Sequence, residues 1–144
     1  MKKLLVVFLL GFAFYGYIDS HPDFIRTITG PAATGGQSLA SAYEHRQSNI
    51  QVSGSGRVIR MLADDNNGSR HQKFIVRLAS GQTVLVAHNI DLAPRIDTLR
   101  EGDTVEFFGE YAWNAKGGVV HWTHHDPDGY HDSGWLKHKG RVYR

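Results

Sequence analysis

Alternation of apolar and polar residues dominates the second half of the chain and predicts a β-rich domain. It is clearest at residues 71–79 (HQKFIVRLA), where every second side chain is expected on the same face. A Ser-Gly turn at 80–81 follows, and residues 82–88 (QTVLVAH), apolar on both faces, return as the antiparallel partner. Further strands are predicted at 56–63, 103–113 and 119–126, and a small hairpin about Lys139 and Gly140 ends the chain.

Two segments have helical rather than alternating spacing. The first precedes the strands and predicts a short helix from the spacing of Leu39, Ala42, Tyr43 and Arg46. The second lies between the third and fourth strands, where a short helix is predicted with Asp91 as N-cap and Gly102 at its end. This order predicts an all-β, OB-fold-like five-stranded Greek-key barrel with a bulge or bend at Gly109. A β-sandwich is the alternative, but it needs more strands.

The first twenty residues have the pattern of an export segment. Lys2 and Lys3 precede an apolar run that has the length of a signal-peptide core and is short for a membrane span. The usual small-x-small cleavage motif is missing, so a cleaved signal peptide and an uncleaved membrane anchor both stay open. Either one sends the domain out of the cytoplasm, to the bacterial periplasm or outside the cell. We therefore divide the chain into residues 1–20, a linker with a short helix at 21–48, and the domain at 49–144.

The charge balance argues against a generally basic domain. The chain has 16 lysines and arginines and 14 acidic residues, and Lys2 and Lys3 belong to the export segment, which leaves 14 of each. A strong non-specific hold on nucleic acid is therefore not implied. The nine histidines gain charge below about pH 6.5, so any binding of anions should strengthen in mild acid. The chain has no cysteine, so an exported domain depends on its core rather than on disulfides.

The strand order places a candidate ligand groove on the second and third strands, because OB barrels bind ligands there between two flanking loops. These loops would be 64–70 and 114–118, and the second strand presents an outward row that includes His71, Lys73 and Arg77. These side chains, with Arg70 at the groove entrance, suit a phosphate-bearing ligand such as nucleic acid or a nucleotide-like compound. The remaining ligand-binding candidates are Asn89, Arg95, Asn114, Lys116 and Trp122.

Two features of this groove oppose that interpretation. Phe74 is expected to point inward, so the second strand offers no outward aromatic ring for base stacking. Asp64 and Asp65 place negative charge at the mouth of the groove, which repels phosphate unless a cation lies between. A solvated basic strand face therefore stays open as the alternative.

The densest run of chemistry-bearing residues is HWTHHDPDGYH at 121–131. On an extended strand His121 and His125 would stand ~14 Å apart, so the run does not form one metal cage. Only His124 and Asp126 have chelating reach on one face, and a third ligand would have to come from His131, His88 or His71. The sequence leaves open whether a metal or any other cofactor binds.

Without a metal, the same residues suit acid–base chemistry. A carboxylate such as Asp126 can fix the tautomer of an imidazole that then transfers protons. Hydrolysis of a phosphodiester fits this pattern, with His71, His88, His121, His124 and Asp126 as the catalytic candidates. The alternatives are histidines exposed to solvent at a strand end, core packing for His88, and a turn role for Asn89.

A function of another class also fits the sequence. The domain could be a non-catalytic module of the cell envelope that contacts a protein or cell-wall partner through a pH-sensitive histidine surface. Membrane contact is expected only through the N-terminal segment. Binding of single-stranded nucleic acid at pH 6, lost in high salt, would favour the first hypothesis over this one.

Five strings resemble one known family. DDNNGSRHQKFIV, LVAHNIDLAPR, GDTVEFFGEYAWN, GGVVHWTHHDP and GWLKHKGRVY are similar to the domain of unknown function 3465 family of small exported bacterial proteins. The resemblance covers about residues 50 to 143, and the YAW string is its one slight departure. It implies export and small size, and no activity that can be transferred to this chain.

Overall fold

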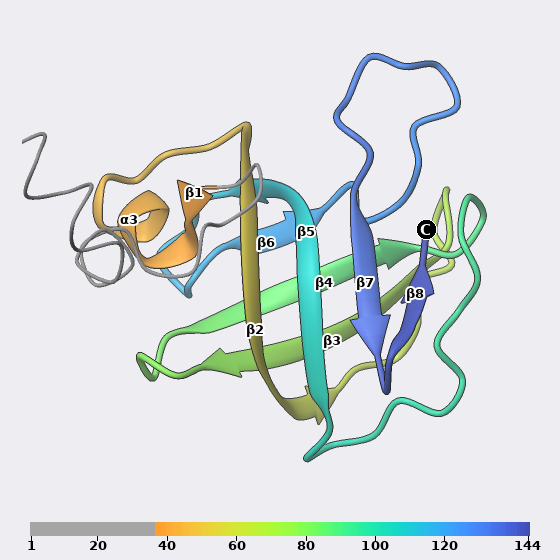
Figure 1. Ribbon diagram of the computed structural model, residues 1–144, viewed down its shortest axis with the longest axis horizontal. Helices are drawn as coiled ribbons and strands as arrows, with labels where there is room; N and C mark the ends of the chain where they lie inside the picture. The colour runs from red at the N-terminus through yellow and green to blue at the C-terminus, as the bar shows by residue number, and fades with distance from the viewer. Residues whose placement is uncertain (1–36) are drawn as a thin grey trace, which may run out of the picture. The chain divides into compact units, whose positions relative to one another are not determined.

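Five strands close into a barrel in the computed structural model, which describes residues 37–144 (Figure 1). The order around the ring is β2-β3-β4-β6-β5, and β5 pairs back with β2. β4 and β6 run parallel, and the other neighbours in the ring run antiparallel. This is the topology of the OB fold, so the predicted OB-fold-like barrel is confirmed. The five strands are β2 (Ile50–Met61), β3 (His71–Leu78), β4 (Thr83–Asn89), β5 (Thr104–Ala112) and β6 (Val119–His121).

Alternation sets the register of the β3–β4 hairpin. Phe74 pairs with Val86, and Val76 pairs with Val84, and all four side chains are buried in the barrel. A shift by one residue would turn these side chains to solvent, so the burial of one face specifies the pairing. The predicted strands at 71–79 and 82–88 therefore match β3 and β4 closely.

β2 is the longest strand and serves two neighbours in turn. Its first part pairs with β5 and its last part with β3, and the register with β3 shifts between Val58 and Arg60. Such a bulge bends a strand, which helps a small barrel to close. Gly109, where a bulge or bend was expected, continues the regular pairing with Val52. A Cβ on Gly109 would lie 2.5 Å from the carbonyl oxygen of His121, so the glycine permits close approach of β6.

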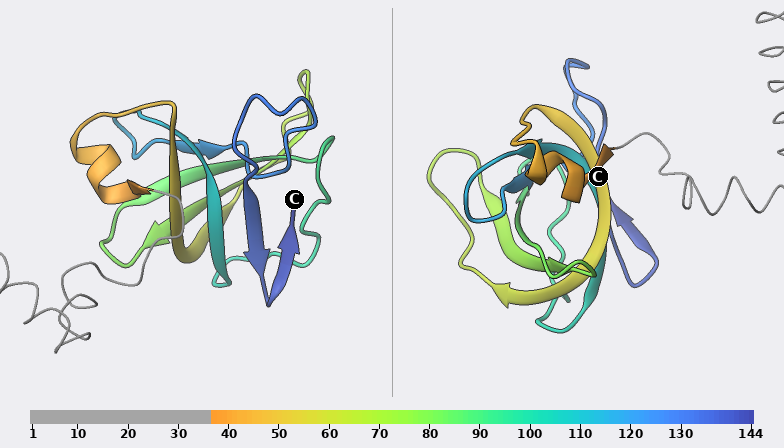
Figure 2. Two further views of the ribbon diagram at one scale, coloured as in Figure 1. Left: turned by 45° about the horizontal axis from the view of Figure 1, so that its top comes forward. Right: turned by 90° about the vertical axis from the view of Figure 1, so that its left-hand side faces the viewer.

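One end of the barrel is closed by β1 (Gln37–Ser38) and the short helix α3 (Leu39–Glu44) (Figure 2, right). The hydroxyl of Ser38 caps the helix by accepting from the N–H of Ser41 (3.3 Å), and Leu39 and Ala42 are buried in the core. The predicted short helix is therefore confirmed. The domain boundary predicted at residue 49 would separate this helix from the core to which it belongs.

The other end of the barrel is closed by residues 90–103, and the helix predicted there is absent: this segment forms turns. Gln72 explains the difference, because its side chain points into the barrel and replaces the helical hydrogen bonds of Ile96. The amide oxygen of Gln72 accepts from the N–H of Ile96 (2.9 Å), and its amide nitrogen donates to the carbonyl of Ile96 (3.0 Å). Asp91, expected as an N-cap, instead accepts from the backbone and side chain of Arg70.

A C-terminal hairpin extends the sheet beyond the barrel. β7 (Trp135–His138) pairs with β5, and β8 (Arg141–Tyr143) pairs with β7. Lys139 and Gly140 both adopt positive φ at its turn (48° and 78°), so the predicted hairpin about these residues is confirmed. At the base of the hairpin, the buried His138 donates from Nε2 to Asp103 (2.9 Å).

The last predicted strand, 119–126, is wrong beyond His121. Trp122 adopts φ +52°, in the left-handed region that side chains rarely occupy, and this ends the alternation. Residues 122–134 then form a long loop that rises above the barrel (Figure 1). The export segment predicted at 1–20 lies outside the described residues. Within 37–144, the structure contains no helix with the length and apolar character needed to cross a membrane.

Candidate ligand-binding face and histidine cluster

The outward side of β2 and β3, with the loop that joins β5 and β6, carries a group of basic side chains, which we call the cationic face. Paired residues on neighbouring strands share a face, so Arg57 lies beside Arg77, and Arg60 lies beside Ile75. Arg57, Arg60 and Arg77 are all exposed. The cationic face is defined by Arg57, Arg60, Lys73, Arg77 and Lys116.

Most of these cations have no acidic partner. Lys73 lies 3.8 Å from Asp65, whereas the other four form no ion pair within residues 37–144. Arg70 and Arg95, by contrast, are engaged by carboxylates close by. The cationic face therefore presents positive charge to the solvent.

A small cleft lies on this face beside Lys116. It has a volume of about 180 Å³, its floor is aliphatic, and Asn114 and Lys116 lie at its side. The floor residues Leu62, Ile75 and Leu85 are half-buried. Phe74 is fully buried inside the barrel, as expected from the alternation, so β3 offers no outward ring. The face therefore combines positive charge with aliphatic surface.

Four of the predicted ligand residues are engaged within the domain. The backbone N–H and the guanidinium of Arg70 both donate to Asp91, at 2.8 and 2.7 Å. These hydrogen bonds hold the pKa of Asp91 below its usual range. Arg95 contacts Asp64 (2.9 Å) and also Asp97. The side chains of Asn89 and Asn114 accept backbone N–H groups in their own turns.

The acidic groove mouth expected from Asp64 and Asp65 is largely neutralised. Asp64 accepts two hydrogen bonds from the guanidinium of Arg95, at 2.9 and 3.3 Å. Asp65 lies within ion-pair distance of Lys73. Arg95 and Lys73 therefore reduce the repulsion between these two aspartates and a phosphate. The cations without acidic partners then determine the net charge of the face.

The histidines that are scattered in the sequence come together at the end of the barrel closed by residues 90–103. His124 and His71 lie close enough to His88 to help lower its pKa, and His131, His71 and His124 do the same for His121. These histidines are therefore neighbours in space. They do not share an open cleft, however, because His88 and His124 are buried, at 0% and 3% exposure.

His88 is a neutral core histidine. Its Nε2 lies 3.2 Å from the carbonyl of Pro94 and so carries the proton that it donates, while Nδ1 accepts from the hydroxyl of Thr123 (2.8 Å). Burial, with smaller contributions from nearby imidazoles, lowers the pKa of His88 to about 4. With both nitrogens engaged and no exposed surface, His88 does not serve the catalytic role considered above, and it gains no charge in mild acid.

His71 and His124 are both fixed through Nδ1. His71 donates to the carbonyl of Ser69 (2.8 Å), and His124 donates to the carbonyl of His125 (2.8 Å). On an extended strand His124 and Asp126 would share a face. The strand ends before Trp122, so they do not. His71 is half-buried at the margin of the cationic face, beside Lys73 on β3.

Asp126 shapes the loop, and its carboxylate forms no hydrogen bond with an imidazole of residues 37–144. Its carboxylate accepts from the backbone N–H groups of Asp128, Tyr130 and His131 at 2.7–3.0 Å. These bonds hold the pKa of Asp126 below its usual range, the bond from His131 contributing most. The predicted acid–base pair of Asp126 with a histidine is therefore wrong.

Two half-exposed imidazoles meet at a carboxylate that the sequence did not single out. Glu110, on β5, lies 3.6 Å from Nε2 of His121 and 3.1 Å from Nδ1 of His131. Trp122 stacks on the ring of His131, with centroids 3.8 Å apart. Burial lowers the pKa of His121, while Glu110 acts in the opposite direction. Glu110 could have been found from its outward position in the alternating strand, but its two partners lie 11 and 21 residues away.

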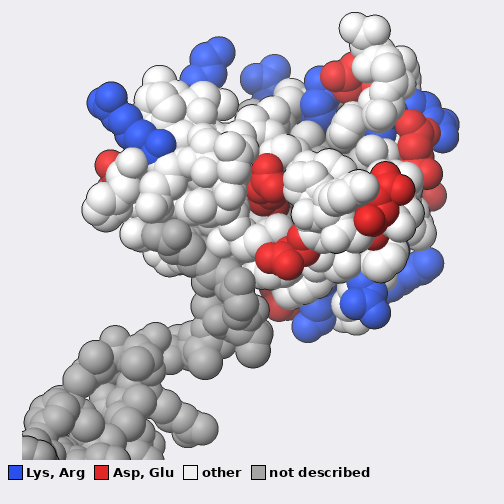
Figure 3. Space-filling view, turned by 90° about the horizontal axis from the view of Figure 1, so that it is seen from above, with Lys and Arg blue, Asp and Glu red and all other residues white. Residues whose placement is uncertain are grey.

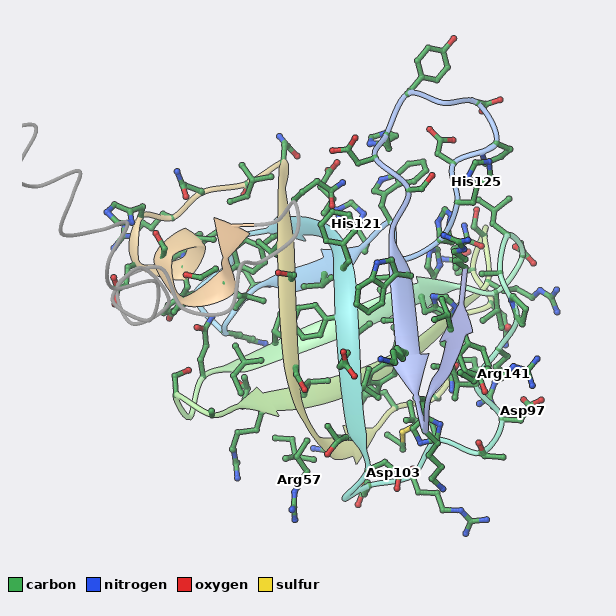
Figure 4. All side chains as sticks on the ribbon, in the orientation of Figure 1. Arg57, Asp97, Asp103, His121, His125 and Arg141 are labelled. Carbon is green, nitrogen blue, oxygen red and sulfur yellow. The ribbon has the colours of Figure 1, made fainter. Side chains whose placement is uncertain are left out.

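Charged side chains of both signs lie on the surface seen from above (Figure 3). Seen from above, acidic side chains gather in the centre and on the right, and lysines and arginines lie along the margins (Figure 3). In Figure 4, His121 and His125 lie in the upper half, whereas Arg57 points away from the barrel at its lower edge. The cationic face and the 122–134 loop are therefore different parts of the surface.

No set of three or more histidine, aspartate and glutamate side chains within residues 37–144 is placed to hold a metal ion. Comparison with known families gives one finding: the model of the family described as "Protein of unknown function (DUF3465)" matches residues 25–144. No curated protein matches the chain.

Proposed function

The chain belongs to the DUF3465 family, and we propose that it binds a nucleic-acid strand through its phosphates on the cationic face. The observation that carries the proposal is the group of four cations without acidic partners, Arg57, Arg60, Arg77 and Lys116. Arg57 and Arg60 lie on the first barrel strand, Arg77 lies beside them on the second, and Lys116 lies in the loop that joins the fourth and fifth. OB barrels usually bind ligands on the second and third strands beside this loop, so the group adjoins that surface.

The chemistry of the face favours contact with the strand's backbone over contact with its bases. Arginine side chains suit phosphate because their planar groups donate two hydrogen bonds at once. Ile75 and Leu85 offer aliphatic surface between the cations, and the one ring on β3, Phe74, points inward. Binding should therefore depend little on base sequence and strongly on salt.

Binding without hydrolysis is the form of the proposal that the geometry supports. His88 is buried with both nitrogens engaged, and the carboxylate of Asp126 is held by the loop backbone. The predicted export segment, if it functions as expected, would place this binding in the periplasm or outside the cell. The ligand would then be extracellular or periplasmic nucleic acid.

A second candidate function is a pH-sensitive contact with a protein partner. It is favoured by one observation, the position of Glu110 between His121 and His131 beneath the 122–134 loop. The side chains of the two histidines are about one third exposed, at 35% and 34%. Protonation of His121, whose pKa is lowered by burial, would add positive charge to that surface.

The proposal is tested by fluorescence anisotropy with a labelled oligothymidylate and the full chain. A triple variant, Arg60→Gln, Arg77→Gln and Lys116→Gln, should bind more weakly, and its plot of log K against log salt should be less steep by about 2, since each lost contact to a single strand contributes about 0.7. The matched control, Arg100→Gln, Arg141→Gln and Arg144→Gln, removes the same charge elsewhere on the surface. Equal weakening by both triples would mean that only net charge matters, and would refute the proposal.

A further inference from the structure

We propose that Arg57 and Arg77 form a clamp for a terminal phosphate, so that the bound strand is held by a phosphorylated end. This inference rests on the proposed function and adds the chemical group that the face prefers. The group is a phosphomonoester at the end of a chain, in contrast to the phosphodiesters along it.

Arg57 and Arg77 are direct cross-strand partners on β2 and β3. Both side chains are exposed, and neither forms an ion pair within residues 37–144. A hollow of about 500 Å³ lies at the pair, and the hydroxyl-bearing Ser55 and Thr104 also line it. The site therefore offers two guanidinium groups and two hydroxyl groups around one open space.

The register that brings these arginines together is fixed from the other side of the sheet. Val58 and Val76 are the next pair along, and both are buried in the core. Like charges directly opposite each other destabilise an antiparallel pair. Two acidic residues lie near the pair across the sheet, and both are engaged: Asp103, beside the partner of Arg57, by His138 at 2.9 Å, and Glu106, opposite Ser55, by Lys137 at 3.5 Å. The repulsion is therefore built into the fold, and a bound anion would relieve it.

The charge of the pair matches a terminal phosphate better than an internal one. A phosphomonoester carries about −1.5 to −2 at pH 7 and has three acceptor oxygens, whereas each phosphodiester of a strand carries a single negative charge. Two arginines supply two positive charges and enough donors for all three oxygens. The rest of the strand would then pass over Arg60 and the aliphatic floor towards Lys116.

The test compares three labelled oligothymidylates of one length, with a 5′-phosphate, with a 3′-phosphate and with neither, bound to the full chain. One phosphorylated form should bind about tenfold more tightly than the unphosphorylated strand, the size expected for extra hydrogen bonds between charged groups. Arg57→Gln and Arg77→Gln should each remove this preference. The control Arg60→Gln, on the same face, should weaken all three strands alike and keep the preference.

The possible failures are distinguishable. Equal affinity for all three strands in the wild type would overturn the clamp and leave the proposed function in place, whereas no binding of any strand would overturn both. A second measurement needs no oligonucleotide. In phosphate-free buffer Arg77→Gln should melt at or above the wild-type temperature, and pyrophosphate should raise the melting temperature of the wild type only. Equal stabilisation of both proteins by pyrophosphate would also overturn the clamp.

Discussion

The neutral His88 in the barrel makes the stability of the domain depend on pH between 6.5 and 4. Folding lowers the pKa of His88 from 6.5 to about 4. Between these pH values His88 is therefore protonated in the unfolded chain and neutral in the folded domain. Stability is fully present above pH 6.5, falls as the pH drops towards 4, and loses nothing further from this group below that. At about 1.4 kcal/mol per pH unit the loss is about 3 kcal/mol, a large part of the stability of a typical domain.

Denaturant unfolding at a series of pH values between 7 and 4 measures this loss. Replacement by a residue that does not titrate, His88→Gln, should lower stability at pH 7 and make the curve flatter between 6.5 and 4. His45→Gln is the matched control for the loss of an imidazole, because His45 is exposed and lies directly after α3. Should His88→Gln keep the full wild-type slope, the assignment of His88 as a neutral core group would be wrong.

Three further changes test other parts of the structure. Gly118→Ala should cost about 2–4 kcal/mol in thermal or denaturant unfolding, because φ is +88° and a Cβ would lie 2.2 Å from the ring of Tyr111. Asp126→Ala should speed amide hydrogen exchange in the 122–134 loop by roughly tenfold or more while leaving β3 and β4 protected, since it removes the acceptor of three N–H groups; unchanged exchange would contradict this role. The hydrogen bond from His138 holds the pKa of Asp103 below 3.8, so its stabilisation is present above that pH and is lost as the pH falls further. Asp103→Asn should therefore flatten the acid side of the stability curve, and an unchanged acid limb would count against it.

The strands and their order were predictable because the signal is local. The alternate burial of residues in β3 and β4 follows from the alternation of apolar and polar residues within each strand, and a tight turn joins the two strands. Lys139 and Gly140 likewise mark the C-terminal turn by residue type. From these parts, the OB-fold-like topology followed.

Two of the wrong predictions have causes that the local pattern does not contain. Apolar residues between Asp91 and Gly102 have helical spacing, yet Gln72 takes the hydrogen bonds of Ile96 from 24 residues away. Trp122 ends a strand through a backbone angle that nothing in its residue type demands. Local pattern carries neither constraint.

The candidate site was predictable only in outline. Lys73 and Arg77 followed from alternation, and the face of the barrel that carries them followed from the topology. The pairing of Arg57 with Arg77 depends on the register between two strands, and the three-residue meeting at Glu110 depends on how the 122–134 loop folds back. These contacts join residues that are 11 to 21 positions apart, so they required the structure.

The closure of both barrel ends separates recognition from stability. With α3 at one mouth and residues 90–103 at the other, the lumen is a packed core that admits no guest. A ligand of this domain must therefore bind on the outer surface of the barrel. The side chains there can be substituted without changing the packing of the core. Descendants of one such scaffold can therefore change their preferred molecule by surface substitution alone, while selection on the interior continues to maintain the same fold.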